Sequence, residues 1–285
     1  MRASFDLSFR ALVASALCIG IGTRACASDE ASPGAGRVLA NPEAHLNLGF
    51  FQDWGKDLVL LPQEPRSWGA AEYLQIGALA GVGVTLYSQD DRIRDYIQRH
   101  RTSVRDRWAE NLQHFGGGIG PAVILIGLYG TGEIIGDRRA RRTALVAIES
   151  LAVSGVFNQA LKYATHRHRP NSGDDRSTWS GPSLSTTNLS FASGHTTAAF
   201  ALATSLAEGY SDVVWVPPLV YGLATATALA RMELDKHWAS DVFVGALIGY
   251  GTAHGLGLLY PKDGQISAIP IVTLDEFGVA VSANF

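Results

Sequence analysis

The sequence has little charge, few cysteines and no excess of positive residues. Only 17% of its 285 residues are charged, and 23 Lys and Arg against 26 Asp and Glu give a formal net charge of −3. A slightly acidic chain lacks the basic excess that binding to nucleic acid needs, so we expect no nucleic-acid partner. Because 47% of the residues are hydrophobic, the chain can bury enough apolar surface to fold, which excludes an intrinsically disordered protein.

Both cysteines lie in an N-terminal segment with the pattern of an export signal. Two arginines flank its basic start, an apolar run covers residues 11–22, and Ala25-Cys26-Ala27 offers the small residues that a signal peptidase accepts. The apolar run is too short to cross about 30 Å of hydrocarbon. We therefore predict a cleaved signal peptide over residues 1–27, with a first buried or membrane helix as the alternative, and a mature chain without disulfides.

The rest of the chain is rich in apolar segments with helical spacing and has almost no strand pattern. These segments cover residues 71–88, 115–135, 143–163, 195–208, 213–234 and 238–259. They predict an all-α fold, a six-helix bundle. Only the tail differs, because residues 269–285 alternate apolar and polar side chains around a short polar turn, which predicts a β-hairpin.

These patterns divide the chain into four parts. After the signal peptide we expect an N-terminal linker and lead-in over 28–70, a helical domain over 71–262 and the hairpin over 263–285. A basic run at 92–107 fits either a helix on a membrane surface or a solvated helix with interleaved acidic residues, and we expect the solvated helix.

Cationic side chains gather at the ends of apolar helices in two of three reactive segments. Lys162 and Arg169 lie in the first segment, which ends at Pro170, a residue that cannot continue a helix; Arg231 opens the third. A buried positive charge is unfavourable unless an anion shares its site. Arginine binds phosphate oxygens through two parallel N–H groups, and lysine adds a point charge. The pattern predicts a phosphate-binding site.

The second and third segments add groups suited to phosphoryl transfer. Ser193 and Gly194 form a turn that enters a helix, where free backbone N–H groups would cradle an oxyanion. Two histidines, His195 and His237, can divide nucleophilic attack and proton donation between them. Asp241 follows His237 by four residues, so on a helix its carboxylate would share a face with the imidazole and fix its tautomer.

The three segments together resemble a known signature. Lys162-x6-Arg169-Pro170, Ser193-Gly194-His195 and Arg231-x5-His237-x3-Asp241 are similar in order and spacing to the motifs of the type 2 phosphatidic acid phosphatase and vanadium haloperoxidase superfamily. The chain looks like an exported, acid phosphatase-like member. The resemblance implies the superfamily's helical core and makes the predicted domain over 71–262 a phosphatase domain.

The resemblance also implies roles for the site residues. His237 would be the nucleophile that forms a phosphohistidine, Asp241 its orienting partner and His195 the general acid. The residues implied in phosphate binding are Lys162, Arg169, Ser193, Gly194 and Arg231. The superfamily implies no metal and no cofactor for a phosphatase, and a phosphorylated small molecule or lipid phosphate as its partner.

Two positions depart from the superfamily's usual pattern. Ala192 stands where members usually have proline, and Ala230 stands where they usually have serine. A looser turn and a lost hydroxyl would weaken stabilisation of the transition state, so we expect modest activity.

Several polar residues near the motifs have less specific patterns. We expect His166 and His168 to be exposed loop residues, and residues 171–190 to form a long loop of the kind that often covers a site. His254 and Glu149 lie within apolar helices and are interpreted as paired structural groups.

Topology decides the substrate class, because the superfamily includes six-span membrane enzymes and soluble exported phosphatases. If the chain spanned the membrane, three crossings before Lys162 would place the site in the cytoplasm, opposite to the side usual in the superfamily. Arginines at 92–107 and 138–142 also flank one helix at both ends, so no orientation satisfies the positive-inside tendency. We therefore expect a periplasmic protein, soluble or at the membrane surface; an integral inner-membrane protein is the alternative.

The predicted function is a metal-independent phosphatase that hydrolyses phosphate monoesters or lipid (pyro)phosphates through a phosphohistidine. The alternatives are a vanadate-dependent haloperoxidase and a non-catalytic envelope protein that binds anionic headgroups. The sequence contains no pattern that indicates an oligomeric state.

Overall fold

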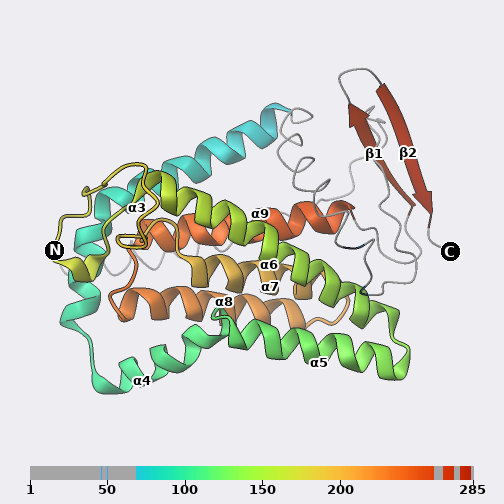
Figure 1. The fold of residues 1–285 in the computed structure, drawn as a ribbon, viewed down its shortest axis with the longest axis horizontal. Coiled ribbons are helices and arrows are strands. Elements are labelled where there is room, and N and C mark those ends of the chain that lie inside the picture. The colour runs from blue at the N-terminus through green and yellow to red at the C-terminus, as the bar shows by residue number, and fades with distance from the viewer. Residues whose placement is uncertain (1–45, 47–49, 51–68, 260–265, 273–276, 284–285) are drawn as a thin grey trace. The chain divides into compact units, whose positions relative to one another are not determined.

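Seven α-helices make up the helical part of the chain that the structure describes. The structure is a computed structural model that describes residues 46, 50 and 69–259 and the backbone of 266–272 and 277–283. The helices are α3 (Ala70–Arg99), α4 (Ser103–Leu112), α5 (Ile119–Ile135), α6 (Arg138–Thr165), α7 (Gly194–Gly209), α8 (Val216–Glu233) and α9 (Ala239–Leu259) (Figure 1). The all-α prediction is confirmed for this part; the predicted signal peptide and nearly all of the lead-in lie outside the described residues.

The count of six helices is too low, because each predicted apolar segment forms a helix and α4 is an additional one. Helix α4 is polar, so a search for apolar segments misses it. The basic run at 92–107 is not one solvated helix: it lies on α3 and α4, with a break at His100 to Thr102. Two of its arginines form ion pairs with α8 and the turn after it, Arg94 with Asp235 and Arg105 with Glu233.

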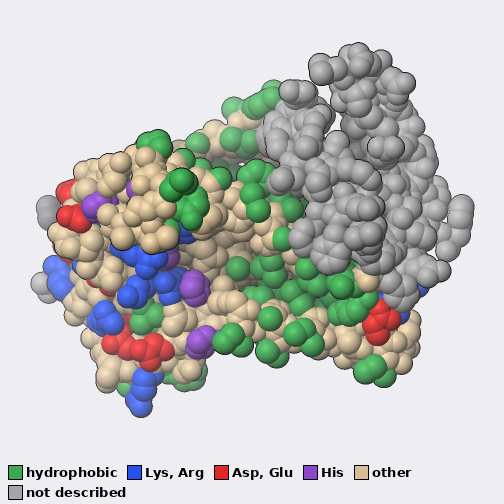
Figure 2. All heavy atoms as spheres, viewed as in Figure 1, with side chains coloured by type: hydrophobic (Ala, Val, Ile, Leu, Met, Phe, Trp, Pro, Cys, Tyr) green, Lys and Arg blue, Asp and Glu red, His purple; other side chains and the backbone are tan. Residues whose placement is uncertain are grey.

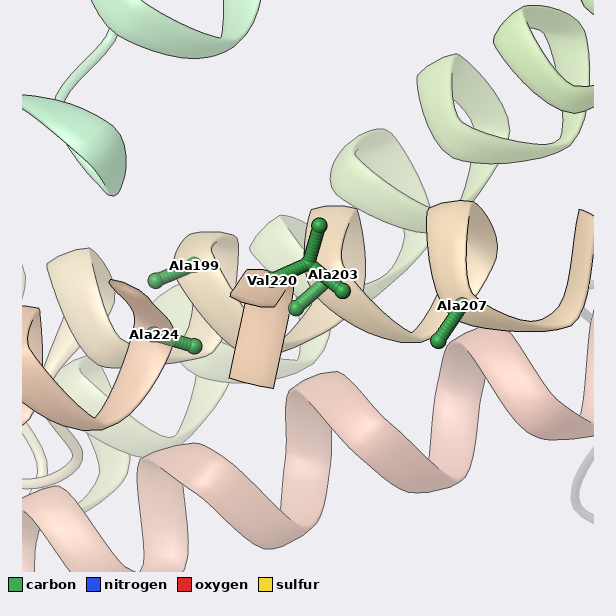
Figure 3. Packing of buried hydrophobic residues seen from close by; sticks show 5 residues of the cluster. All are labelled: Ala199, Ala203, Ala207, Val220 and Ala224. Atoms are coloured by element: carbon green, nitrogen blue, oxygen red, sulfur yellow. The ribbon is translucent and has the colours of Figure 1, made fainter. Parts of the chain in front are cut away.

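Helix α7 is the central helix and packs against α6, α8 and α9 (Figure 1). Its contact with α8 is built from small side chains, shown in Figure 3: Ala199, Ala203, Ala207, Val220 and Ala224. Small side chains let the two helices pack closely, because little volume separates their backbones. The middle and the end of α7 therefore pack closely against α8.

The approach of α9 to α7 is closer still and depends on glycine. A Cβ atom on Gly249 would lie 2.2 Å from the carbonyl oxygen of Thr197, and one on Gly245 would lie 2.7 Å from that of Ser193. No side chain fits at these distances, so glycine is required for close contact of the two backbones. This contact brings the Ser193 turn next to the start of α9.

The start and the end of α6 are set by the residues next to them. The Asp137 carboxylate caps α6 by accepting hydrogen bonds from the amides of Arg139 and Ala140. Helix α6 ends at Thr165, where His166 adopts a left-handed conformation with φ of 42°. Pro170 lies beyond this end, in a short 3-10 turn, so it does not terminate the helix as the sequence suggested.

The C-terminal segment contains two strands, β1 (Ile266–Val272) and β2 (Phe277–Ala283). They pair antiparallel, with Ile266 opposite Ala283 and Val272 opposite Phe277. The connecting residues 273–276 lie outside the described residues.

Candidate active site

Four helix ends meet where the three sequence motifs converge. Figure 1 shows the end of α6, the start of α7, the end of α8 and the start of α9 at the same end of the bundle. Lys162 lies in the last turn of α6, Ser193 caps α7 and Arg231 lies in the last turn of α8. Figure 2 shows Lys, Arg and His side chains gathered on this part of the surface. Segments distant in sequence therefore form one site.

Three cations of this site lie close together with few internal partners. Lys162 and Arg231 are buried, and Arg169 is partly buried. Lys162 Nζ donates to the Leu189 carbonyl at 2.7 Å and Arg231 Nη1 donates to Gln113 Oε1. Within the described residues, the Arg169 guanidinium has no hydrogen-bond partner and the buried Nε of Arg231 also lacks one.

Burial and mutual repulsion lower the pKa values of these three cations. Burial, with Arg169 nearby, lowers the pKa of Lys162 to about 8. Burial, again with Arg169 nearby, lowers the pKa of Arg231 to about 10. Burial also lowers the pKa of Arg169. An anion bound among them would relieve both the desolvation and the repulsion.

His195 lies in the first turn of α7 and faces these cations. Burial, followed by the charges of Arg231, Arg169 and Lys162, lowers its pKa to about 4. Its ring makes no hydrogen bond to any described residue. At neutral pH the imidazole is therefore uncharged, and its nitrogens are available to a ligand.

The helix start also presents backbone donors. The Ser193 amide donates to the Asp241 carbonyl at 3.0 Å, so it is not free as the sequence suggested, and Ser193 Oγ accepts from the amide of Thr196. The next two amides, of Gly194 and His195, donate to no described residue. These are the amides that a helix leaves for an anion at its first turn.

His237 lies in the turn before α9 and not on the helix, so it does not share a helical face with Asp241. Its Nδ1 donates to the Ser190 carbonyl at 2.8 Å, whereas the Asp241 carboxylate is 3.8 Å away. Because a carbonyl only accepts, the proton is on Nδ1 and the lone pair is on Nε2. Burial lowers the pKa of His237 to about 3. The expected tautomer is thus fixed by Ser190, a residue that the sequence analysis missed.

Asp241 is fully buried and accepts three hydrogen bonds that the sequence did not reveal. Ser190 Oγ donates at 2.6 Å, Arg167 Nη1 at 2.6 Å and the Trp238 amide at 3.0 Å. Burial favours the neutral acid, but the neighbouring His237 ring, Arg167 and Ser190 outweigh it and lower the pKa of Asp241. The carboxylate is a charged centre that orders the turn before α9.

The two histidines between the first motif's ends differ from expectation. His166 is only 2% exposed, and its Nε2 lies 2.9 Å from the Ser185 carbonyl. His168 is partly buried and bonds to Asp174 and Ser180. Both were expected to be exposed; instead, they hold the loop at 171–190 against the end of α6.

Two further polar residues support the site. Arg167 is fully buried and contacts Asp241 directly, although it lies between the recognised motif positions. Asn158 Nδ2 donates to the Ala192 carbonyl at 3.2 Å and to Thr197 Oγ1 at 3.0 Å, which fixes the start of α7. A polar amide within an apolar helix was the available sequence signal for Asn158.

The two residues that we interpreted as paired structural groups, His254 and Glu149, differ in exposure. His254 Nδ1 lies 2.6 Å from Glu208 Oε1 on the surface, so this histidine is paired but exposed. Glu149 is completely buried in α6.

Metal and membrane signals are sparse in the described part of the chain. No group of three or more His, Cys, Asp or Glu residues there is placed to hold a metal ion. Among the same residues, α6 alone is long and apolar enough to cross a membrane, and half of its apolar window is buried in the fold. The segments Ser103–Phe115 and Ile119–Ile135 pass the same test together, bent by 46°.

Comparison with known proteins places these motifs in a family. The PAP2 superfamily model matches residues 143–264. A lipid A 1-phosphatase of Porphyromonas gingivalis is 35% identical over 100 residues, which are 35% of this chain and 20% of that protein, so the match spans one fifth of the relative's length.

Two solved structures align with part of this chain. The crystal structure of LpxE from Aquifex aeolicus has a TM-score of 0.46 and 21% identity, covering 59% of this chain and 93% of that one. A transmembrane PAP2 type phosphatidylglycerolphosphate phosphatase from Bacillus subtilis has a TM-score of 0.49 and 19% identity, covering 63% and 92%. The motif resemblance is confirmed by the family match: residues 143–264, which contain all three motifs, match the PAP2 superfamily, the type 2 phosphatidic acid phosphatases.

Proposed function

We propose that this protein is a phosphatase that hydrolyses phosphate monoesters, with lipid phosphates as its substrate class, through a phosphohistidine at His237. The observation that carries the proposal is the pairing of two neutral imidazoles with three poorly partnered cations in one site. The cations Lys162, Arg169 and Arg231 would bind the phosphoryl oxygens. The free amides of Gly194 and His195 and the Ser193 hydroxyl would complete the cradle.

The two histidines would act on opposite sides of the phosphorus atom. The Nε2 lone pair of His237 forms the N–P bond while the bond from phosphorus to the leaving oxygen breaks. That oxygen takes a proton from His195, whose pKa the bound anion raises. In the second half, His195 accepts a proton from water, water oxygen bonds to phosphorus and the N–P bond breaks. No step in this sequence requires a metal ion.

The lipid substrate class is supported by the relative and by the surface of the fold. The similar Porphyromonas gingivalis protein is a lipid A 1-phosphatase. Helix α5 exposes apolar side chains, with Ile119 77%, Val123 64%, Ile126 73% and Ile134 86% exposed. Exposed apolar stretches of this kind mark membrane or protein contacts. We therefore propose an exported protein held at the periplasmic membrane surface, with an integral inner-membrane protein as the alternative.

Purified protein tests the proposed activity directly. We expect hydrolysis of p-nitrophenyl phosphate and of a lipid phosphate in detergent that persists in EDTA, is inhibited by vanadate and is lost in His237→Ala. His254→Ala is the matched control, since His254 is an exposed histidine outside the site. Halide oxidation with added vanadate, without phosphatase activity, would support a haloperoxidase instead. Headgroup binding without turnover would support a non-catalytic envelope protein.

Cell fractionation tests the proposed location. We expect the protein in the membrane pellet after a high-salt wash and released by mild detergent, because an apolar contact does not weaken with salt. Recovery in the soluble periplasmic fraction would contradict attachment through α5.

A further inference from the structure

Helix α3 precedes the region that matches the family, and one of its faces carries polar side chains directed at the site. Asp90, Arg94 and Gln98 are spaced by four residues, so they lie on the same face of α3. This face packs against the end of α8 and the start of α9.

Arg94 and Gln98, nearer the C-terminal end of α3, bind the turn that connects Arg231 to His237. Arg94 donates two parallel hydrogen bonds to Asp235, both at 2.8 Å. Gln98 Nε2 donates to the carbonyls of residues 232 and 233, both at 3.2 Å. A planar fork and a bidentate amide fix orientation as well as distance. The spacing between a proposed phosphate-binding cation and the proposed nucleophile is therefore set partly by α3.

Asp90 binds the start of α9 and Arg167. It is 1% exposed, its Oδ1 accepts from the Ser240 amide at 2.9 Å, and its Oδ2 accepts from Ser240 Oγ at 2.6 Å and from Arg167 Nη2 at 2.8 Å. Ser240 Oγ must donate to Asp90, because it already accepts from Arg167 Nη1. Both oxygens of Asp90 only accept, as in an ionised carboxylate.

Arg167 lies between two buried carboxylates. One arm of its guanidinium binds Asp90, and the other donates to Asp241 Oδ1 at 2.6 Å. The rings of Tyr87 and Trp179 enclose it, each with its centroid 5.0 Å from the guanidinium carbon. One positive charge is thus shared by two negative charges in a site closed to water.

Asp241 connects this group to the proposed nucleophile through Ser190. The Ser190 hydroxyl donates to Asp241, and the Ser190 carbonyl accepts the Nδ1 proton of His237. We propose that Asp90 is a positioning residue for the reaction: by sharing Arg167 with Asp241 it sets the position and charge of the carboxylate that orients His237. This inference rests on the proposed phosphatase activity.

The physical effect would be on the chemical step and not on substrate binding. When His237 takes the phosphoryl group its imidazole becomes cationic, and the negative charge of Asp241 stabilises it. If Asp90 loses its charge, Arg167 pairs with Asp241 alone and neutralises more of the negative charge of Asp241. Asp90 touches none of the groups proposed to bind phosphate, so substrate affinity should be preserved.

The test is Asp90→Asn, with Asp95→Asn as matched control. Asp95 is exposed on the same helix, so its substitution removes the same charge outside the network. We expect Asp90→Asn to lower kcat about tenfold or more with KM within about threefold, and Asp95→Asn to leave both unchanged. In an Arg167→Met background, Asp90→Asn should lower kcat little further, because both changes interrupt the same path.

The outcomes separate the two proposals. A wild-type protein without phosphatase activity would overturn the proposed function, whatever Asp90 does. An active wild type with an Asp90→Asn variant of unchanged kcat and lower melting temperature would overturn the positioning role, as would a raised KM at unchanged kcat. If Asp90→Asn does not fold, Asp90→Ser, a smaller neutral side chain that also removes the charge facing Arg167, must give the same fall in kcat; unchanged kcat there also overturns it.

Discussion

His195 and His237 are both neutral rings in a positively charged site, but their surroundings suit them to different work. The Nδ1 of His237 is held by the Ser190 carbonyl, so Nε2 has a fixed lone pair suited to attack. The His195 ring has no partner among the described residues and lies beside three cations, so its protonation responds to the charge of whatever binds. Fixed geometry favours a nucleophile, and a responsive pKa favours a proton donor.

The need for His195 as an acid depends on the leaving group. His195→Ala should slow hydrolysis of alkyl phosphates by about 100-fold or more, because a poor leaving group needs a proton. Hydrolysis of p-nitrophenyl phosphate should fall much less, since its leaving group departs without one. Steady-state kinetics on the two substrates provides the comparison, and equal slowing would argue against His195 as the acid.

Burial and the charges around the His195 ring lower its pKa. Arg169→Gln removes one of the cations that lower the pKa of His195, so that pKa should rise from about 4. Titration of the His195 imidazole by NMR measures this without any need for turnover. The His254 signal, from an exposed ring paired with Glu208, is the internal control and should titrate as in the wild type. A His195 pKa that stays unchanged would place Arg169 farther away than the structure does.

At the scale of elements, the close contact of α7 with α9 brings the second motif to the third. Gly249→Ala would place a methyl group 2.2 Å from a backbone oxygen of α7, and backbone cannot rotate away as a side chain can. We expect about 1–3 kcal/mol of destabilisation, measured by chemical denaturation, and a loss of activity as the motifs separate.

Gly251 offers a control for this substitution on the same helix. A Cβ there meets nothing within 4 Å, so Gly251→Ala should be neutral or stabilising by about 0.5–1 kcal/mol through helix propensity. Equal effects of the two substitutions would contradict close packing at Gly249.

Sequence patterns predict apolar helices better than polar helices and loop contacts. Periodic apolar segments predicted six helices because burial of one face leaves a regular pattern. Helix α4 was missed because its residues are mainly polar, and the burial of His166 was missed because loop contacts leave no periodicity. The motif residues were found by spacing within short segments. Asp90 and Arg167 were not, because their pairing joins residues 77 apart in sequence.

At the scale of the whole molecule, the buried neutral histidines link stability to pH. In the unfolded chain their pKa is 6.5, whereas in the fold it is about 4 for His195 and about 3 for His237. Below pH 6.5 the unfolded state binds more protons, so the contribution of these groups to stability falls as the pH drops towards 3.

Denaturation midpoints between pH 7 and 4 measure this linkage. We expect the midpoint to fall with acid, and to fall less steeply in His195→Gln, which removes one of the titrating rings. Inorganic phosphate or vanadate should raise the midpoint, because a ligand that binds only the folded state stabilises it. Parallel curves for wild type and variant would contradict a buried neutral His195.

His237 is expected to carry the phosphoryl group during turnover. Rapid acid-free quenching of the enzyme with a phosphate ester, followed by mass spectrometry of the peptide around residue 237, tests it most directly. We expect an acid-labile, alkali-stable phosphate on His237 that forms within the first turnover and is absent in His237→Gln. Phosphate on another residue, or turnover at the wild-type rate in His237→Gln, would contradict it.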